Sequence, residues 1–208
     1  MSYEKPDLAS HMHPLLIVIS GPSGVGKDAT LARMKEAGLP FHYVVTATTR
    51  PKRMGEENGV EYHFLPEEQF HQRVKTKWFL EWAKVYGNYY GVPKEEIKGA
   101  LERGQDVIIK VDIQGAATIR QILPDAVFIF LMPPSTKELA ERLKQRHSQS
   151  SAELNMRLAK AQEEIKNLSL FDYVVVSYKD KLDLTVSQIN AIVTAERCRV
   201  KPRGVKLK

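Results

Sequence analysis

The stretch LLIVISGPSGVGKD, residues 15–28, decides the fold of this 208-residue chain. Its first six residues form an apolar run of strand length, and the glycine-rich segment after them opens a helical pattern at 26–37. Gly21, Gly24 and Gly26 let successive backbone N–H groups converge on a phosphate group, and Lys27 follows where its ammonium reaches the outer phosphates. The stretch predicts a strand, a phosphate-binding loop and a helix, with Lys27 as the central phosphate-binding side chain.

The rest of the chain repeats this alternation of strand and helix. Apolar runs at 43–47, 107–111, 126–131 and 173–176 alternate with helical patterns at 114–123, 135–145, 151–168 and 183–199. Capping boxes begin two of these helices, Ser135 with Glu138 and Ser150 with Glu153. The βαβ rhythm predicts an α/β fold with a mainly parallel sheet that helices cover on both faces.

Two segments interrupt the alternation. Residues 48–93 are turn-rich and aromatic, with GEENG at 55–59 and YGNYYG at 86–91, and we interpret them as a small inserted subdomain. The polar string RHSQSS at 146–151 separates two arginine-bearing helical patterns, which predicts the tip of a mobile flap.

Composition narrows the classes of protein. The apolar runs are too short for a membrane-spanning helix, which needs roughly 18 residues. The single cysteine, Cys198, cannot form an internal disulfide, so we expect a reducing, cytoplasmic setting. The formal charge of +6 comes from six cations in 197–208, and residues 1–196 are neutral. We therefore interpret 200–208 as a solvated basic tail rather than a nucleic-acid-binding arm, and 1–14 as a disordered segment or cloning remnant.

Arg50 and Arg53 lie three apart in a predicted turn with tyrosines nearby, a combination that suits the dianion of a phosphate monoester. They belong to TATTRPKRMGEENGVEYHF, residues 46–64, and FLEWAKVYGNYYG follows at 79–91. With these motifs the chain resembles guanylate kinase from about Leu15 to Arg199. The resemblance implies a P-loop kinase fold and transfer of a phosphoryl group from ATP to GMP and dGMP. It also implies a core (15–47, 94–134 and 169–199), a GMP-binding subdomain (48–93) and a lid (135–168).

The resemblance also assigns candidate site residues. For ATP these are the loop residues Gly21, Pro22, Ser23, Gly24, Val25, Gly26, Lys27 and Asp28. For the phosphate of GMP they are Arg50, Arg53, Tyr62 and Tyr90; for the base they are Thr46 and Glu81, with Gly91 beside them. A buried Glu81 would accept from the N1–H and 2-amino groups of guanine, which adenine lacks.

Arg142, Arg146 and Arg157 match the lid arginines, which with Lys27 would neutralise the transferring group. The nucleophile is an anionic phosphate oxygen, so no general base is needed. Asp112, at the end of a predicted strand, is a candidate ligand for the Mg²⁺ that accompanies ATP, with helix capping as its structural alternative.

Several positions depart from the family pattern. Asp28 stands where the loop normally has a Ser or Thr whose hydroxyl holds Mg²⁺, and Thr30 points to another face of the helix. Val92 replaces a hydroxyl residue that contacts guanine, Lys110 replaces an acid, and Ser177 lies where the family often has Asn near adenine. We hypothesise that Asp28 either ligates Mg²⁺ or pairs with Lys110 when nucleotide is absent.

Two alternatives stay open, and these departures motivate the first of them. One is a related P-loop kinase with another phosphorylated acceptor. The other is a guanylate-kinase-like module that binds phosphopeptides, although such modules characteristically lack the working phosphate loop and the lid arginines. The sequence does not determine the oligomeric state.

Overall fold

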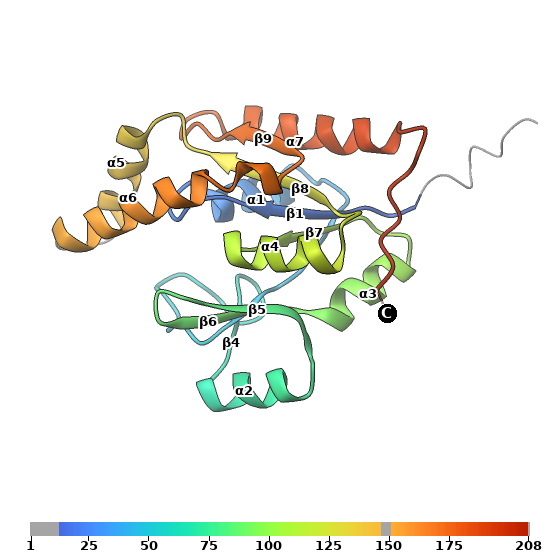
Figure 1. Ribbon diagram of the computed structural model, residues 1–208, viewed down its shortest axis with the longest axis horizontal. Helices are drawn as coiled ribbons and strands as arrows, with labels where there is room; N and C mark the ends of the chain where they lie inside the picture. Colours follow the sequence, from blue (N-terminus) through green and yellow to red (C-terminus); the bar gives the residue numbers. More distant parts are fainter. Residues whose placement is uncertain (1–12, 147–150, 208) are drawn as a thin grey trace, which may run out of the picture.

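The computed structural model describes residues 13–146 and 151–207, and Figure 1 shows the arrangement of their elements. The larger sheet has the strand order β2 (His42–Tyr43), β7 (Val107–Lys110), β1 (Leu16–Ser20), β8 (Val127–Met132) and β9 (Tyr173–Val176). Every neighbouring pair in this sheet is parallel. The predicted α/β class is therefore confirmed.

Alternate residues of β1 serve two hydrophobic cores, which explains why its apolar run is continuous. Ile17 and Ile19 pack with α1 (Lys27–Glu36) and α7 (Leu182–Arg197). Leu16 and Val18 pack with α3 (Lys94–Glu102) and α4 (Ile113–Ile122) on the opposite face. In Figure 1, α7 and α4 lie on opposite sides of the sheet. All five strands run in one direction, so their carboxyl ends share one edge.

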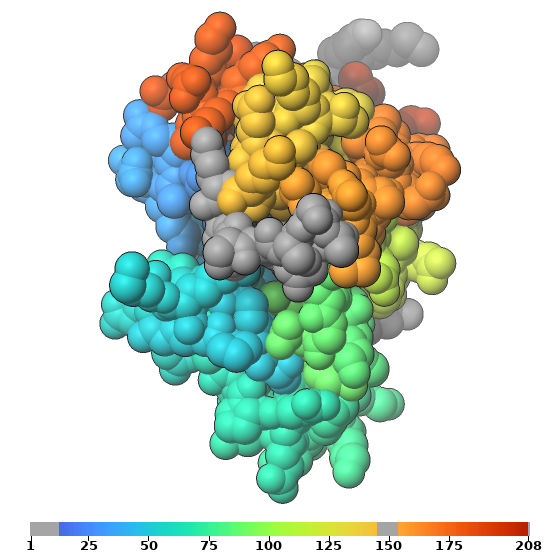
Figure 2. All heavy atoms as spheres, turned by 90° about the vertical axis from the view of Figure 1, so that its left-hand side faces the viewer, coloured from blue at the N-terminus to red at the C-terminus, as the bar shows by residue number. Residues whose placement is uncertain are grey.

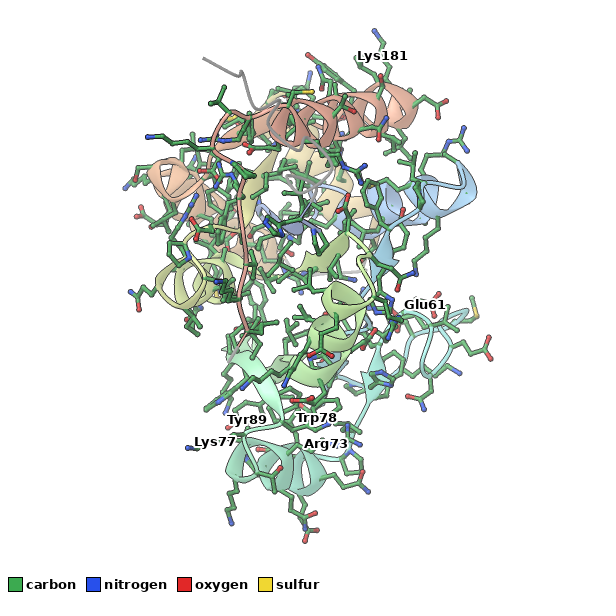
Figure 3. All side chains as sticks on the ribbon, turned by 90° about the vertical axis from the view of Figure 1, so that its right-hand side faces the viewer. Glu61, Arg73, Lys77, Trp78, Tyr89 and Lys181 are labelled. Atoms are coloured by element: carbon green, nitrogen blue, oxygen red, sulfur yellow. The ribbon has the colours of Figure 1, made fainter. Side chains whose placement is uncertain are left out.

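A second, smaller sheet occupies most of the interruption that the sequence showed. Its order is β4 (His63–Phe64), β3 (Ala47–Thr48), β6 (Asn88–Pro93) and β5 (Phe79–Val85), and it is mixed. Helix α2 (Glu67–Lys75) covers it with the buried Phe70, whose ring stacks on Phe79 and Tyr89. Figure 3 shows Arg73, Trp78 and Tyr89 gathered beside α2, where Arg73 lies over the Trp78 ring.

The small sheet contains the main errors of the prediction. The run 43–47 is wrong as one strand, because Tyr43 ends β2 in the large sheet and Ala47 begins β3 in the small one. An apolar run does not reveal that the chain crosses between sheets. Helices α2 and α3 and strands β5 and β6 were not predicted, because their short segments lie between strong turn signals.

Helices α5 (Thr136–Arg146) and α6 (Ser151–Ile165) pack together through Leu139, Leu143 and Ala161, and a short 3₁₀ helix, Leu168–Leu170, follows. Figure 2 shows them, in yellow and orange, above the cyan and green small sheet. The Ser135 hydroxyl accepts from the Glu138 amide, but the Glu138 carboxylate bonds Arg142 instead of completing the capping box. The Ser150 capping box, the flap tip and residues 1–12 lie outside the described residues.

The end of the described chain is partly docked: the prediction of a solvated tail was wrong for Arg203, Val205 and Leu207, whereas Lys201 and Lys206 are exposed. Arg203 donates to the buried Glu196 at 2.8 Å and to the Ala126 carbonyl at 3.1 Å. Val205 and Leu207 pack against the core on the α4 side of the sheet. A count of cations could not reveal that a buried carboxylate binds one of them. Among the described residues, no helix is long and apolar enough to cross a membrane.

Candidate active site

A pocket lies at the carboxyl-end edge of the large sheet, bounded by the phosphate loop, the small sheet and α6. This is the position where open α/β sheets bind ligands. Residues from segments far apart in the sequence meet there. Of the predicted site residues, those lining it are Gly21, Ser23, Gly24, Gly26, Lys27, Asp28, Thr46, Arg50, Arg53, Tyr62, Glu81, Tyr90, Asp112 and Arg157.

The phosphate loop connects β1 to α1 in a conformation that requires glycine. Gly21 has φ 148°, and a Cβ there would stand 2.3 Å from the Leu131 carbonyl oxygen. The Lys27 ammonium donates to the carbonyls of Gly21 at 2.5 Å and Pro22 at 3.2 Å. Burial lowers the pKa of Lys27, although Asp28 and Glu164 oppose this shift. A desolvated ammonium held at the loop is suited to a polyphosphate.

The acidic side chain at position 28 pairs with a cation in the structure. Asp28 lies in the first turn of α1, and its carboxylate accepts from Lys110 Nζ at 2.5 Å. Thr30 is buried and donates to the Gly26 carbonyl within its own helix, so its hydroxyl does not replace that of a loop Ser or Thr. The ion pair between Asp28 and Lys110, one of the two hypothesised roles of Asp28, is present in the structure.

Arg50 is held in place by Glu56. Its Nη2 donates to both carboxylate oxygens, at 2.7 and 2.9 Å, and Glu56 also accepts from the Arg53 amide. Burial favours the neutral acid, but the bonds from Arg50 and Arg53 outweigh it and hold the pKa of Glu56 below its ordinary value. The Arg50 guanidinium lies 5.4 Å from the Tyr62 ring centroid, and the Tyr62 and Tyr90 rings are 6.1 Å apart. Arginine and tyrosines thus form one wall of the pocket.

Glu81, on β5, is a buried carboxyl group with an unused acceptor. It is 6% exposed, and within the described residues nothing donates to its Oε2. Burial, with a smaller contribution from Asp112, raises the pKa of Glu81 to about 8. Gly115, in the first turn of α4, makes room for the carboxyl group, because a Cβ there would stand 2.9 Å from it. Such a group is ready to pair with a ligand that brings donors.

Asp112 caps helix α4, which is the structural role predicted from the sequence as the alternative to metal binding. Its Oδ1 accepts from the Gly115 amide at 2.9 Å, and its side chain also lines the pocket. Capping fixes the orientation of the carboxylate, so the two interpretations are compatible.

Several predicted residues lie elsewhere. Arg142 donates to the carbonyls of Val25 and Ser177 and does not line the pocket, so it braces the phosphate loop. Arg157 lines the pocket and lies over the Tyr86 ring, whereas the Arg146 side chain is outside the described residues. Pro22, Val25 and Gly91 also lie outside the lining.

Gly91 has a packing function. A Cβ at that position would stand 2.6 Å from the Phe79 ring, so the small sheet requires glycine there. Val92 is fully buried in the core on the α4 side and does not line the pocket. The Val92 side chain therefore forms no part of the pocket surface. Ser177 is buried beside Gly26 without lining the pocket.

Sequence reasoning missed Glu164. This residue of α6 is 9% exposed, lines the pocket and has an Oε2 without a donor among the described residues. Burial raises its pKa, and the nearby Lys27 and the Ser23 amide oppose the shift. No motif contains Glu164, because only the packing of α6 against the loop brings it near Lys27. The hairpin residues Ala83, Val85, Tyr86 and Asn88 also line the pocket and were not predicted.

Comparisons with known proteins agree with this geometry. The family model described as guanylate kinase matches residues 13–196. "Guanylate kinase 2, chloroplastic/mitochondrial" of Oryza sativa is 44% identical over 207 residues, covering 99% of this chain and 73% of that protein. A guanylate kinase of Caldanaerobacter subterraneus is 45% identical over 186 residues, 89% of each protein. The crystal structure of a guanylate kinase from Anaplasma phagocytophilum matches with a TM-score of 0.74 and 29% identity, covering 91% of this chain and 89% of that one.

Proposed function

Since this chain belongs to the guanylate kinase family and catalyses the ATP-dependent phosphorylation of GMP to GDP, we propose that the pocket described above is its active site. One observation carries the proposal: the phosphate loop and the wall of Arg50, Tyr62 and Tyr90 line the same cavity. Direct transfer requires a donor triphosphate and an acceptor monophosphate to meet in line, and a cavity lined by both sets of phosphate-binding groups provides this.

On the donor side, the loop from Gly21 to Asp28 binds the phosphates of ATP. Backbone N–H groups and the Lys27 ammonium neutralise the negative charge of these phosphates. To do so, Lys27 exchanges its hydrogen bonds to the Gly21 and Pro22 carbonyls for hydrogen bonds to phosphate oxygens. Arg142 keeps the loop in shape through the Val25 carbonyl. Arg157 and Arg146 act from the lid, formed by α5 and α6, on the transferring group.

On the acceptor side, Arg50 and Arg53 with Tyr62 and Tyr90 bind the phosphate of GMP. Glu81 and Thr46 recognise the base. When guanine enters, its N1–H and 2-amino groups supply the donors that Glu81 lacks, and the carboxyl group ionises. The acceptor oxygen is already anionic, so it attacks without a general base. Deoxyguanosine monophosphate carries the same groups and is also an acceptor.

Mg²⁺ accompanies ATP in this proposal, and the carboxylates present fit it. Asp112 and Asp28 offer hard oxygen donors on the loop side of the pocket. The described residues contain no cluster of three or more metal-ligating side chains, so they form no complete cage. That suits an ion bound through one or two carboxylates, water and substrate phosphates. When bound, Mg²⁺ would neutralise negative charge on the phosphates of ATP.

We place the enzyme in the reducing cytosol, because its single cysteine has no partner cysteine in the chain. ATP and GMP are its proposed small-molecule partners, and the neutral charge of residues 1–196 argues against nucleic acid.

A transfer assay with ATP labelled at the γ-phosphate tests the assignment. The label should appear in GDP when Mg²⁺ and GMP are both present, and chelation of Mg²⁺ should stop its appearance. Arg50→Met should raise the KM for GMP about tenfold or more and leave the KM for ATP unchanged. Release of the label as inorganic phosphate at the same rate with and without GMP would contradict the proposal.

A further inference from the structure

Lys110 connects the two halves of the pocket. It is the last residue of β7, and its Nζ lies 2.5 Å from Oδ1 of Asp28 in the first turn of α1. The same ammonium lies 4.3 Å from the centroid of the Tyr62 ring, next to the small sheet. One cation therefore contacts both the phosphate loop and the wall that faces the acceptor phosphate.

The neighbours of Lys110 place it on the phosphate side of the acceptor site rather than on the base side. The Tyr62 ring beneath its ammonium also lies against the Arg50 guanidinium and the Tyr90 ring. The base-recognising Glu81 instead lies against Gly115, and Asp112 helps to raise the pKa of Glu81. The Lys110 side chain is 13% exposed, and its ammonium forms an ion pair with Asp28. Lys110 is therefore a charged group that faces phosphate-binding residues.

We propose that Lys110 is a third cation for the acceptor phosphate, beside Arg50 and Arg53, and that Asp28 sequesters it until donor occupies the phosphate loop. The inference rests on the proposed function of the pocket. With the loop empty, GMP competes with the Asp28 carboxylate for the ammonium. When Mg²⁺ and ATP engage Asp28, Lys110 is released to the GMP phosphate. Donor and acceptor then bind with positive coupling, which must be equal in both directions.

The Asp28–Lys110 pair is not needed for the fold. The Asp28 side chain is 49% exposed and that of Lys110 is 13% exposed, and neither residue belongs to the hydrophobic clusters that form the two cores of the large sheet. Substitutions at either residue should therefore leave the chain folded. The binding of guanosine, which uses the base-recognising residues but carries no phosphate, reports the integrity of the rest of the site.

The test is a set of equilibrium titrations of GMP and guanosine, with and without Mg²⁺ and a non-hydrolysable ATP analogue. Without analogue, Asp28→Asn should bind GMP at least about threefold more tightly than the parent protein. With analogue, Lys110→Met should weaken GMP binding by about tenfold or more. Neither variant should change guanosine binding. In the Lys110→Met background, Asp28→Asn should lose its effect, because the ammonium that it releases is absent.

Two variants outside the pocket serve as matched controls. Lys35 lies over the Tyr43 ring at 5.3 Å, and Asp183 pairs with Arg33 at 2.6 Å. Lys35→Met and Asp183→Asn should leave every affinity unchanged. Additive effects of Asp28→Asn and Lys110→Met, or equal effects on guanosine and GMP, would overturn the inference. If the parent protein with analogue binds no GMP, the proposed function itself fails. If it binds GMP and Lys110→Met has no effect, only this inference fails.

Discussion

The carboxyl group of Glu81 lies so close to Gly115 that a Cβ added to Gly115 would stand 2.9 Å from the carboxyl carbon and from both of its oxygens. Gly115 is also the residue whose amide Asp112 caps. One glycine at the start of α4 thus positions the base-recognising acid and the candidate metal ligand together.

Gly115→Ala should displace the Glu81 carboxyl group and impair GMP recognition. We expect the KM for GMP to rise by about tenfold or more, because a shift of about 1 Å in a binding group is costly. The KM for ATP should not change. Gly99→Ala is the matched control, since Gly99 is also helical and its added Cβ would meet only the flexible end of Arg103. Equal KM values for GMP in parent and Gly115→Ala enzyme would show that the contact does not position Glu81.

The buried Glu81 should make stability depend on pH. Its pKa in the folded protein is about 8, against an ordinary value of 4.5. Between these values the folded chain holds a proton that the unfolded chain has lost, so the free energy of unfolding falls as pH rises. Glu81→Gln removes this dependence. Chemical denaturation should give similar stabilities at pH 5, and at pH 8 the variant should be more stable by about 3 kcal/mol, the order that these two pKa values imply. Exposed Glu68→Gln is the control, and parallel pH profiles for parent and Glu81→Gln would disprove the explanation.

Lys27→Met should abolish turnover without loss of stability. Removing a cation from the transferring group should lower kcat by at least about 10²-fold. The Lys27 ammonium is buried at a cost to the fold, which lowers its pKa, so the methionine variant should unfold at the same temperature or higher. Lys35→Met, on the same helix but exposed, should leave both quantities unchanged. Turnover near the parent rate in Lys27→Met would refute the assignment of the phosphate loop.

The docked end of the chain should contribute to stability and not to catalysis. Arg203→Met leaves the buried Glu196 carboxylate without its best partner, and such a loss should cost about 3 kcal/mol. Denaturant titration should detect this, while the KM for ATP should be unaffected. Exposed Lys201→Met should change stability by less than about 0.5 kcal/mol. A similarly small change in the stability of Arg203→Met would mean that the docked end of the chain contributes little to the free energy of unfolding.

The features that could be predicted from the sequence are those whose residues are adjacent in the chain or belong to a family motif. The phosphate loop was found because strand, glycines and lysine are adjacent, and Arg50 and Glu81 because their motifs resemble a known family. Gly115 and Glu164 were missed, since each acts on a residue that another segment brings to it. Glu56 was missed although it lies only six residues from Arg50 in the same loop. The same tertiary packing removes Val92 and Arg142 from the pocket lining. The Asp28–Lys110 pair was predicted because both departures lie at the sheet edge that parallel strands share.

We infer that this pocket transfers phosphoryl groups from ATP to a guanine nucleotide that Glu81 recognises. The most direct measurement is the initial rate of ADP formation from ATP and Mg²⁺ with GMP, dGMP, AMP, CMP and UMP, for the parent enzyme and Glu81→Gln. We expect kcat/KM for GMP to be at least about 10³-fold above that for AMP in the parent enzyme, and this ratio to collapse in Glu81→Gln. Equal rates with GMP and AMP in the parent enzyme, or no turnover with any of the five acceptors, would contradict it.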